Sequence, residues 1–353
     1  MSSLLFMLPF LVCYTIMAVY AERKLSAFMQ DRLGPMEVGP YGLLQTIADL
    51  LKLLQKEQIE NEGVLKWMFR LAPILIFVAV FTGFAAIPLS PEWPGAGFSS
   101  ALLFVIAIVS LDVIGILVAG WASGNKYASL GSLRAAVQLI SYEIPVGLCL
   151  GTVVLYTGTL DLQQISWLQS AGNEHMVPLA GVRAWDVGAI GGFLTWNIFQ
   201  MPILLPVWGV FFIATLAESN RAPFDLPEGE SELVAGFQTE YSGFRWAIIM
   251  LAEYAMMLLA AFLSAVLFFG SWNSPIPNIG SWTFADWTTG PIWGIFWLTG
   301  KALLLVGVQI WIRWTFPRVR IDQLINLNWK YLIPASMILF LLAGFWKMLL
   351  ILP

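Results

Sequence analysis

The sequence predicts an all-α integral membrane protein with about eight transmembrane helices and an interfacial amphipathic helix on the cytoplasmic side. Three observations predict this class: of the 353 residues 59% are hydrophobic, only 11% are charged, and the mean hydropathy is +0.77. Soluble domains contain about 25% charged residues. The whole chain, residues 1–353, is therefore expected to form a single membrane domain.

Eight apolar runs are long enough to cross a membrane, because about 19 to 20 helical residues span its hydrocarbon core. They lie near residues 3–21, 71–89, 101–121, 136–157, 189–217, 244–270, 291–313 and 331–352. The first run lacks a basic leader and a small-residue cleavage site. We therefore expect it to stay as a helix rather than to be removed as a signal peptide.

The basic residues predict the orientation of these helices. Of the 18 Lys and Arg residues, 15 fall in or beside the loops after the first, third, fifth and seventh runs. They are Arg23, Lys24, Arg32, Lys52, Lys56, Lys66, Arg70, Lys126, Arg134, Arg221, Arg245, Arg313, Arg318, Arg320 and Lys330. The intervening loops, near 90–100, 158–188 and 271–290, contain Arg183 alone. By the positive-inside rule, both termini face the outer, periplasmic side. The length and style of the chain favour a bacterial plasma (inner) membrane over an organelle.

Several classes of site are not expected. Cys13 and Cys149 lie in different apolar runs without CxxC spacing, and His175 is the sole histidine. Metal, haem and iron–sulfur sites built from this chain alone are therefore not predicted. There is no phosphate-binding loop, and the glycines at 188, 191 and 192 lie in an apolar run, where they indicate close helix packing. The chain is expected to carry no redox centre and to bind no nucleic acid.

The first inner loop, residues 22–70, is predicted to contain the amphipathic helix near 41–57. Apolar residues recur there at helical spacing, and polar residues fill the opposite stripe. The apolar set is Leu43, Ile47, Leu50, Leu51 and Leu54, and the polar set is Gln45, Asp49, Lys52 and Lys56. Such a helix lies in the membrane interface. It either anchors the loop or covers a cavity. The charged residues 22–24 at the end of the first run favour the second role, because they need a polar environment there.

The connection at residues 218–244 combines carboxylates with apolar side chains. Its acidic residues are Glu218, Asp225, Glu228, Glu230, Glu232 and Glu240, and Phe224, Leu226, Leu233, Val234, Phe237 and Tyr241 are interleaved with them. Pro223 and Pro227 interrupt any helix through this segment. We expect it to pack as one wall of a polar site, and a solvated loop is the alternative.

Three acidic residues lie inside predicted spanning runs at the same depth. Asp112, Glu143 and Glu253 are each nine residues from the inner end of their run, which is roughly 13 Å at 1.5 Å per residue. Acids facing lipid are costly, so such residues face a polar interior. They either form structural hydrogen bonds to Tyr142 or Tyr254, or they form a proton path together with Glu218. A carboxyl group suits proton transfer because its surroundings can shift its pKa.

Two further features of the spanning runs bear on this path. Pro145 frees a backbone carbonyl close to Glu143, which a neighbouring side chain or water has to satisfy. Lys301 is the basic residue that lies deepest inside a run. It is either a counter-ion for Asp112, Glu143 and Glu253 or a side chain that extends outward to the surface, and the sequence leaves both possibilities open.

Four blocks carry a resemblance to a known family. They are RLGPMEVGPYGLLQTIADLLKLLQKE (32–57), GWASGNKYASLGSLRAAVQLISYEIP (120–145), LAESNRAPFDLPEGESELVAGFQTEYSG (216–243) and PRVRIDQLINLNWKYLIP (317–334). Together they resemble the H subunit of respiratory complex I over all four inner loops and the eight-helix layout. The resemblance implies a translocase subunit of proton-pumping NADH:quinone oxidoreductase at the junction of its peripheral and membrane arms.

The resemblance also implies roles for individual residues. A quinone access tunnel would involve Glu22, Arg23, Arg32, Asp49, Arg221, Phe224 and Asp225. A proton path would involve Asp112, Glu143, Glu218, Glu228 and Glu253. Quinone would be the substrate, and FMN and iron–sulfur clusters would be held by partner subunits. Implied partners are the peripheral-arm subunits at the quinone site, the neighbouring small membrane subunits and membrane lipid.

Other functions remain as alternatives. The homologous membrane subunit of an energy-converting hydrogenase uses no quinone, and a plastid-type relative passes electrons from ferredoxin to plastoquinone. A stand-alone secondary transporter would show internal repeats with broken helices, and we find no such symmetry in the sequence. A purely structural anchor would tolerate neutralisation of Glu143 together with Glu253.

Overall fold

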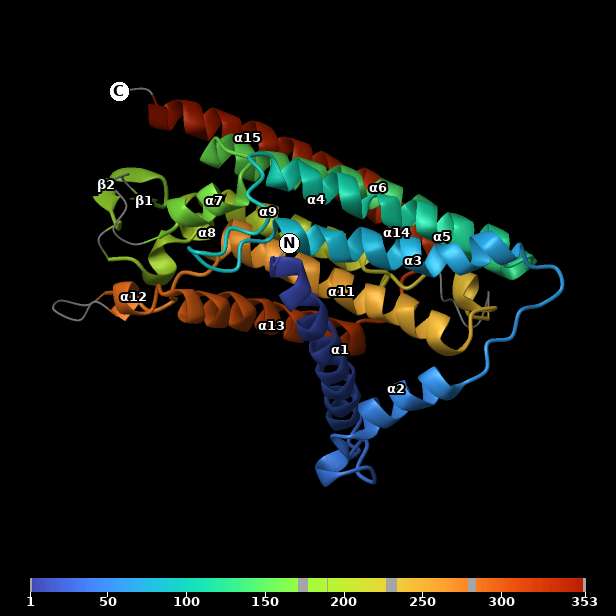
Figure 1. Ribbon diagram of the computed structural model, residues 1–353. Coiled ribbons are helices and arrows are strands. Elements are labelled where there is room, and N and C mark those ends of the chain that lie inside the picture. The colour runs from blue at the N-terminus through green and yellow to red at the C-terminus, as the bar shows by residue number, and fades with distance from the viewer. Residues whose placement is uncertain (1, 171–176, 189, 227–233, 279–283, 352–353) are drawn as a thin grey trace.

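The computed structural model describes residues 2–170, 177–188, 190–226, 234–278 and 284–351, and helices dominate it (Figure 1). The helices are α1 Ser2–Met29, α2 Gln45–Gln55, α3 Lys66–Gly83, α4 Ala101–Val109, α5 Leu111–Ala122, α6 Lys126–Thr157, α7 Leu162–Leu168, α8 Asn197–Gln200, α9 Leu204–Glu218, α11 Gly243–Phe268, α12 Phe284–Trp287, α13 Pro291–Thr315, α14 Ile321–Asn326 and α15 Ile333–Ile351. A π-helical turn at Leu327–Leu332 joins α14 to α15. Strands β1 Pro178–Leu179 and β2 Val182–Asp186 form a small antiparallel hairpin.

Most of the long helices run side by side as a bundle, whereas α1 crosses it at a steep angle and leads to α2 (Figure 1). Among the described residues, six helical stretches are long and apolar enough to cross a membrane. They are Lys66–Ala86, Ala101–Ala122, Lys126–Thr157, Gly243–Phe268, Pro291–Thr315 and Ile321–Leu349. These helices agree with an all-α membrane protein, and the number of about eight spans stays a prediction.

The prediction of one continuous helix over residues 189–217 is wrong. Gly191 and Gly192 have φ angles of 65° and 70°, which non-glycine residues rarely adopt. A side chain at position 192 would meet the backbone of Pro277 at 2.5 Å. Short helical turns therefore precede α9, which has 15 residues. The glycines permit close packing, as the sequence indicates, but the close approach is to a loop.

Two prolines inside long helices have their freed carbonyls satisfied by distant side chains. A proline at position i removes the hydrogen bond to the carbonyl of residue i−4. For Pro145 in α6 this is the Ser141 carbonyl, which accepts a 2.6 Å hydrogen bond from the Asn328 amide. For Pro73 in α3 the corresponding carbonyl accepts a 3.3 Å hydrogen bond from the hydroxyl of Tyr241. Both helices continue through their prolines, and side chains from later in the chain complete them.

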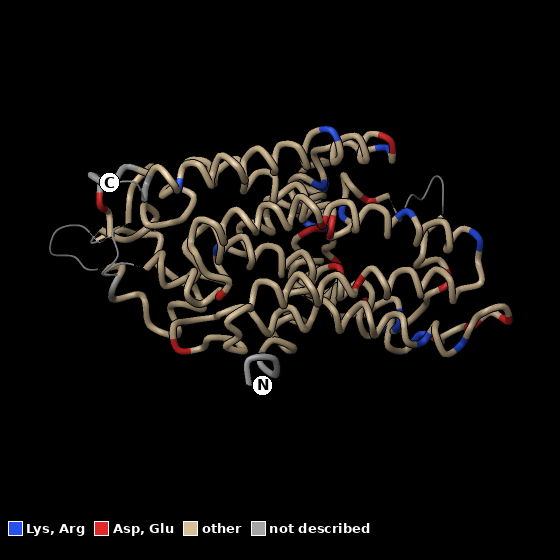
Figure 2. Tube along the Cα trace, turned by 90° about the horizontal axis from the view of Figure 1, so that it is seen from above, with Lys and Arg blue, Asp and Glu red and all other residues tan. Residues whose placement is uncertain are grey.

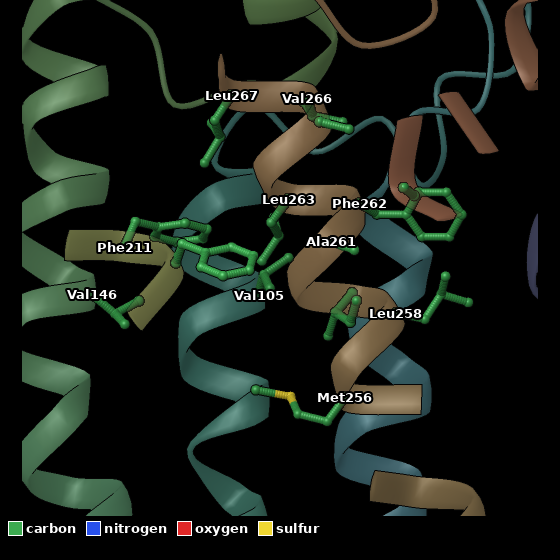
Figure 3. Packing of buried hydrophobic residues seen from close by; sticks show 14 of the residues in the cluster. Val105, Val146, Phe211, Met256, Leu258, Ala261, Phe262, Leu263, Val266 and Leu267 are labelled. Carbon is green, nitrogen blue, oxygen red and sulfur yellow. The ribbon is translucent and has the colours of Figure 1, made fainter. Parts of the chain in front are cut away.

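The apolar core is organised around α11. From Tyr254 to Phe268 this helix is buried throughout. Figure 3 shows Leu258, Phe262 and Leu263 of α11 in this core, with Phe211 from α9, Val105 from α4 and Val146 from α6 packed in the same cluster. Burying apolar surface on every side fixes α11 in the bundle. Its N-terminal half, which carries Glu253, is therefore held at a defined position in the bundle.

Candidate functional site

Four carboxyl groups from four helices line two adjoining cavities in the bundle. Asp112 and Glu218 line both cavities, together with Met256, while Glu253 lines the first and Glu143 the second. Each cavity has about 10 Å³ available to the centre of a water-sized sphere, enough for about one water molecule. Figure 2 shows the acidic residues that gather in the middle of the bundle. Asp112 and Glu218 thus stand between Glu143 and Glu253.

These acids differ in how their charge is compensated. Asp112 and Glu218 are each 8% exposed, and the Oδ1 atom of Asp112 has no hydrogen-bond partner among the described residues. Glu253 accepts a 2.7 Å hydrogen bond from the amide of Gln238, which in turn accepts one of 3.0 Å from the Trp246 indole. A buried acid without a partner is costly when ionised. In this acidic row of Glu143, Asp112, Glu218 and Glu253, the Glu253 carboxylate has a hydrogen-bond donor. One oxygen of Asp112 has none among the described residues.

The structural alternative for the acids named two tyrosines as their partners. The Tyr142 hydroxyl donates instead to the Leu324 carbonyl at 3.2 Å, and the Tyr254 hydroxyl donates to Glu22 at 2.7 Å. Both hydroxyls are therefore engaged elsewhere and do not donate to Glu143 or Glu253.

A second charged cluster is centred on Glu22, close to the C-terminal end of α1. Its carboxylate forms an ion pair with Arg313 of α13, accepts the hydrogen bond from Tyr254 of α11, and lies 3.5 Å from Nη1 of Arg221. The Arg221 guanidinium stacks 3.9 Å from the centre of the Tyr254 ring, and its Nη2 lies 3.9 Å from Oε2 of Glu253. Arg221 and Glu22 are each 6% exposed. Arg221 thus connects this cluster to the acidic row.

The first part of the 218–244 connection packs against α6 and the segment before α14. Phe224 is buried, with its ring 6.0 Å from that of Tyr142. Arg318 contacts both the backbone carbonyl and the carboxylate of Asp225, the latter at 3.3 Å. Asp225 therefore contacts the segment after α13. The sequence-predicted site residue Glu228 lies outside the described residues.

The last part of this connection is tied to the other inner loops. The Glu240 carboxylate accepts hydrogen bonds from Asn61 at 2.5 Å and from Asn125 at 2.7 Å. Asn125 also accepts from the Tyr127 backbone amide, which caps the start of α6. One carboxylate therefore bridges the loop before α3 and the loop before α6.

A neighbouring carboxylate, Glu60, joins two arginines. Arg70 of α3 donates to it at 3.0 Å and 3.1 Å, and Arg245 of α11 donates at 2.6 Å. Hydrogen bonds from Arg70 and then Arg245 lower the pKa of Glu60 to about 2. The carboxylate is therefore ionised at neutral pH and joins the N-terminal ends of both helices.

The site residues predicted in the first inner loop lie on a more exposed face. Arg23 and Asp49 form a 2.5 Å ion pair that joins α1 to α2, with side chains 46% and 35% exposed. Arg32 is exposed in the loop between these helices. On α2, Leu51 and Leu54 are each 52% exposed. The structure thus does not bring these charged residues into the buried cluster of Glu22.

Lys301 adopts neither of the two positions left open by the sequence. Its ammonium group donates to the carbonyls of Phe269, Ser271 and Asn273 at 2.7, 3.0 and 2.6 Å, and lies 4.7 Å from the centre of the Trp196 ring. These carbonyls follow the end of α11, where the helix dipole is negative. Glu253 is 16 residues earlier in the chain than Phe269, roughly 24 Å along a helix. Lys301 therefore stabilises the C-terminal end of α11 and is remote from the acidic row.

Sequence reasoning misses three members of the site. The sequence groups Arg313 with the surface arginines, yet it pairs with Glu22. Tyr254 is expected only as a partner of the buried acids, and Gln238 only as part of the loop. The contacts of Arg313 and Tyr254 with Glu22 join segments far apart in the chain. Those of Gln238 with Glu253 and Trp246 span 15 and 8 residues, but no local pattern marks them either. A hint is available for Arg313 alone, since it lies in the last turn of an apolar helix.

The described residues contain no group of three or more His, Cys, Asp or Glu arranged to hold a metal ion. Cys149 is buried in α6 and Cys13 is exposed on α1, while His175 lies outside the described part of the chain. The site is therefore one of carboxyl groups, arginines and a tyrosine.

Comparison with known proteins places the chain in a family. The protein-family model for NADH dehydrogenase matches residues 1–344. A NADH-quinone oxidoreductase H subunit of Cytophaga hutchinsonii, the second of that name, is 56% identical over 359 aligned residues, which cover 98% of each chain. The NADH-quinone oxidoreductase H subunit of Chlorobium luteolum is 48% identical over 340 residues, covering 96% of this chain and 87% of the relative. The Acidovorax protein of the same name is 44% identical over 325 residues, covering 92% and 84%. The chain therefore belongs to the NADH dehydrogenase family and is a member of its group of NADH-quinone oxidoreductase H subunits.

Proposed function

We propose that this chain, as a membrane subunit of proton-pumping NADH-quinone oxidoreductase, forms the quinone access tunnel and the start of the proton-coupling path. The two cavities that join Glu143, Asp112, Glu218 and Glu253 are the observation that carries the proposal. Each has room for about one water molecule, and a carboxyl–water–carboxyl sequence can pass protons. A purely structural set of acids would be satisfied by fixed donors, whereas Asp112 keeps an oxygen that has no partner among the described residues.

The quinone side of the proposal rests on the cluster around Glu22. Quinone would enter from the bilayer between α1, α2 and α11, since α2 contacts both other helices. Glu22 and Arg221 would face the inner part of the tunnel, with Arg23, Arg32 and Asp49 at the α1 to α2 side. Phe224 and Asp225 belong to the adjoining loop. A quinone that accepts two electrons takes up two protons, and acids beside the tunnel would supply them.

Arg221 would couple quinone reduction to the acidic row. Its guanidinium contacts Glu22 in the tunnel cluster and Glu253 in the row, at 3.5 and 3.9 Å. A change of charge at Glu22 alters the field at Arg221 and thereby the proton affinity of Glu253. Glu218 and Asp112 would relay that change to Glu143. Glu228 is proposed to belong to this path as well.

The proposal includes partners and a location. The electrons would come from an iron–sulfur cluster in a peripheral-arm subunit, and FMN would likewise lie in a partner. Further partners are the neighbouring small membrane subunits and lipid. The proposed location is a bacterial inner membrane. Most of the Lys and Arg residues lie in or beside the loops after the first, third, fifth and seventh runs, which supports an orientation with both termini on the periplasmic side.

Replacing Glu143 with Gln in the assembled complex tests the proposed function. The change keeps the size of the side chain and removes its proton chemistry. Quinone reduction coupled to pumping should fall, while NADH oxidation by an artificial acceptor stays unchanged. Proportional loss of both activities would indicate failed assembly instead, and normal coupled activity after neutralising Glu143 and Glu253 together would contradict the proton-path role.

Co-purification tests the proposed partners. A gently solubilised, tagged chain should bring flavin-containing and iron–sulfur subunits with it. Nickel in a partner would instead support membership of a hydrogenase. A ferredoxin-binding partner without a flavin subunit would support the plastid-type enzyme.

A further inference from the structure

Gln138 of α6 holds the acidic connection at two backbone carbonyls. Its side chain is 1% exposed, and its amide nitrogen donates to the carbonyl of Ala217 at 2.7 Å and to that of Phe224 at 2.8 Å. An amide nitrogen carries two protons, and both are used here. Because carbonyl oxygens are acceptors only, the nitrogen rather than the oxygen of this amide faces the loop.

In the sequence, the residues of the two carbonyls, Ala217 and Phe224, flank Glu218 and Arg221. Ala217 directly precedes Glu218, which lines both cavities. Phe224 donates its backbone amide to the carbonyl of Arg221 at 2.9 Å, so the second carbonyl belongs to the turn that holds Arg221. One side chain therefore fixes the end of α9 relative to that turn.

The remaining atom of the amide shows why a polar residue stands here. Oε1 of Gln138 is buried and has no hydrogen-bond partner among the described residues. An unsatisfied buried acceptor is costly, so a side chain needed only to fill space would be better apolar. The two donated hydrogen bonds are what an apolar residue of the same volume could not supply.

Building on the proposed function, we infer that Gln138 is a positioning residue that sets where Glu218 and Arg221 stand relative to the acidic row. Its contact with Phe224 is to the backbone carbonyl, so Gln138 acts through the two carbonyls and not through a side chain of the proposed quinone path. When the hydrogen bonds are present, Glu218 lies at the cavities and Arg221 lies between Glu22 and Glu253. When these hydrogen bonds are lost, the turn is free to move, and Glu218 and Arg221 leave these positions.

The test uses two variants of the assembled complex in native membranes. Gln138→Leu keeps the approximate volume and removes both donors. Gln138→Glu leaves one donor when the new carboxyl is protonated and none when it is ionised. Glu218, Arg221 and Asp225 on the loop and Glu143 on α6 are unchanged in both. The matched control is Gln163→Leu, which removes a single amide contact to the Pro91 carbonyl at the other end of the bundle.

We expect Gln138→Leu to lower kcat for quinone reduction by roughly tenfold to a hundredfold, since misplacing a group by about 1 Å can cost about a hundredfold. KM for a short-chain quinone and NADH oxidation by an artificial acceptor should change less than twofold. For Gln138→Glu the ratio of the two activities should fall as pH rises from 6 to 8, more steeply than in the parent. The control should match the parent.

Two results would overturn the inference. Either variant could lose both activities in proportion, which is the behaviour of a packing residue, or it could keep the parent ratio at every pH. If Gln138→Leu does not assemble, the pH profile of Gln138→Glu decides. Normal Gln138 variants together with an impaired Glu143→Gln variant would reject this inference and leave the proposed function standing. Normal behaviour in all of them would reject both.

Discussion

Removing the Arg221 side chain tests the link between the two charged clusters. Arg221 lies 3.5 Å from a Glu22 oxygen and 3.9 Å from a Glu253 oxygen, and stacks at 3.9 Å on Tyr254. Each ion pair contributes about 4 kcal/mol of Coulomb attraction at an effective dielectric constant of about 20. Desolvation offsets much of this, and removing one partner of a buried pair typically costs about 3 to 5 kcal/mol. If the same free energy is lost from the arrangement that supports quinone reduction, the activity falls by a hundredfold or more, at about 1.4 kcal/mol per factor of ten.

We therefore expect Arg221→Met to lower kcat/KM for quinone reduction by about a hundredfold or more. Arg221→Lys should recover only a minor part, because an ammonium group cannot reach both carboxylates or stack as the planar guanidinium does. The assay is quinone reductase activity normalised to NADH oxidation by an artificial acceptor. Lys126→Met, which removes a lysine at the inner end of the bundle, is the control.

A double-mutant cycle decides whether the loss arises from the pair with Glu253. If the two side chains interact, the combined Arg221→Met and Glu253→Gln variant should lose less than the sum of the single losses, by about 1 kcal/mol or more. Strictly additive losses would refute the coupling described here. Parent-like activity in Arg221→Met would refute the role of the cluster altogether.

Three further predictions follow from the contacts around the site. Asn328→Leu should lower thermal stability by about 1 to 3 kcal/mol by leaving the Ser141 carbonyl unpaired, and much less in a Pro145→Ala background, where the helix supplies its own donor; equal losses in both would contradict this. Glu60 has a pKa of about 2 in place of 4.5. The stabilisation from its pairing with Arg70 and Arg245 is therefore fully present above pH 4.5 and is lost as pH falls toward 2. Amide hydrogen exchange in the inner loops should show this acid-induced loosening, and Glu60→Gln should loosen them already at neutral pH. Lys301→Met should reduce the thermal stability of the complex, while the surviving complex keeps its ratio of quinone reduction to artificial-acceptor activity, and a changed ratio would tie Lys301 to the acidic row.

The grouping of three acids could be predicted because their spacing from the helix ends depends on local geometry. A constant rise per residue and an equal distance from the inner helix ends put Asp112, Glu143 and Glu253 at one depth. The structure indeed places all three on adjoining cavities. The proton path itself stays a prediction. The need for a donor near Pro145 was also predictable, because a proline always frees a carbonyl in a helix.

The contacts that join distant segments could not be predicted from the sequence. The pair of Glu22 and Arg313 links the two ends of the chain, and the three carbonyls that hold Lys301 belong to a connection some 30 residues away. Backbone carbonyls leave no trace in a sequence pattern. The break before α9 could not be predicted for another reason. A hydropathy scale scores Gly191 and Gly192 as compatible with a spanning helix, whereas their positive φ angles come from tertiary packing.

The proline contacts of α3 and α6 have a consequence for biogenesis. The donor for α3, Tyr241, follows its acceptor by 172 residues, and the donor for α6, Asn328, follows by 187. At about 5 to 20 residues per second, the ribosome needs roughly 10 to 40 s to deliver either one. During that interval each nascent helix enters the membrane with an unmatched oxygen that water or the insertion machinery has to solvate. The final conformation of α3 is thus reached only after about two thirds of the polypeptide has been synthesised, and that of α6 only close to its end.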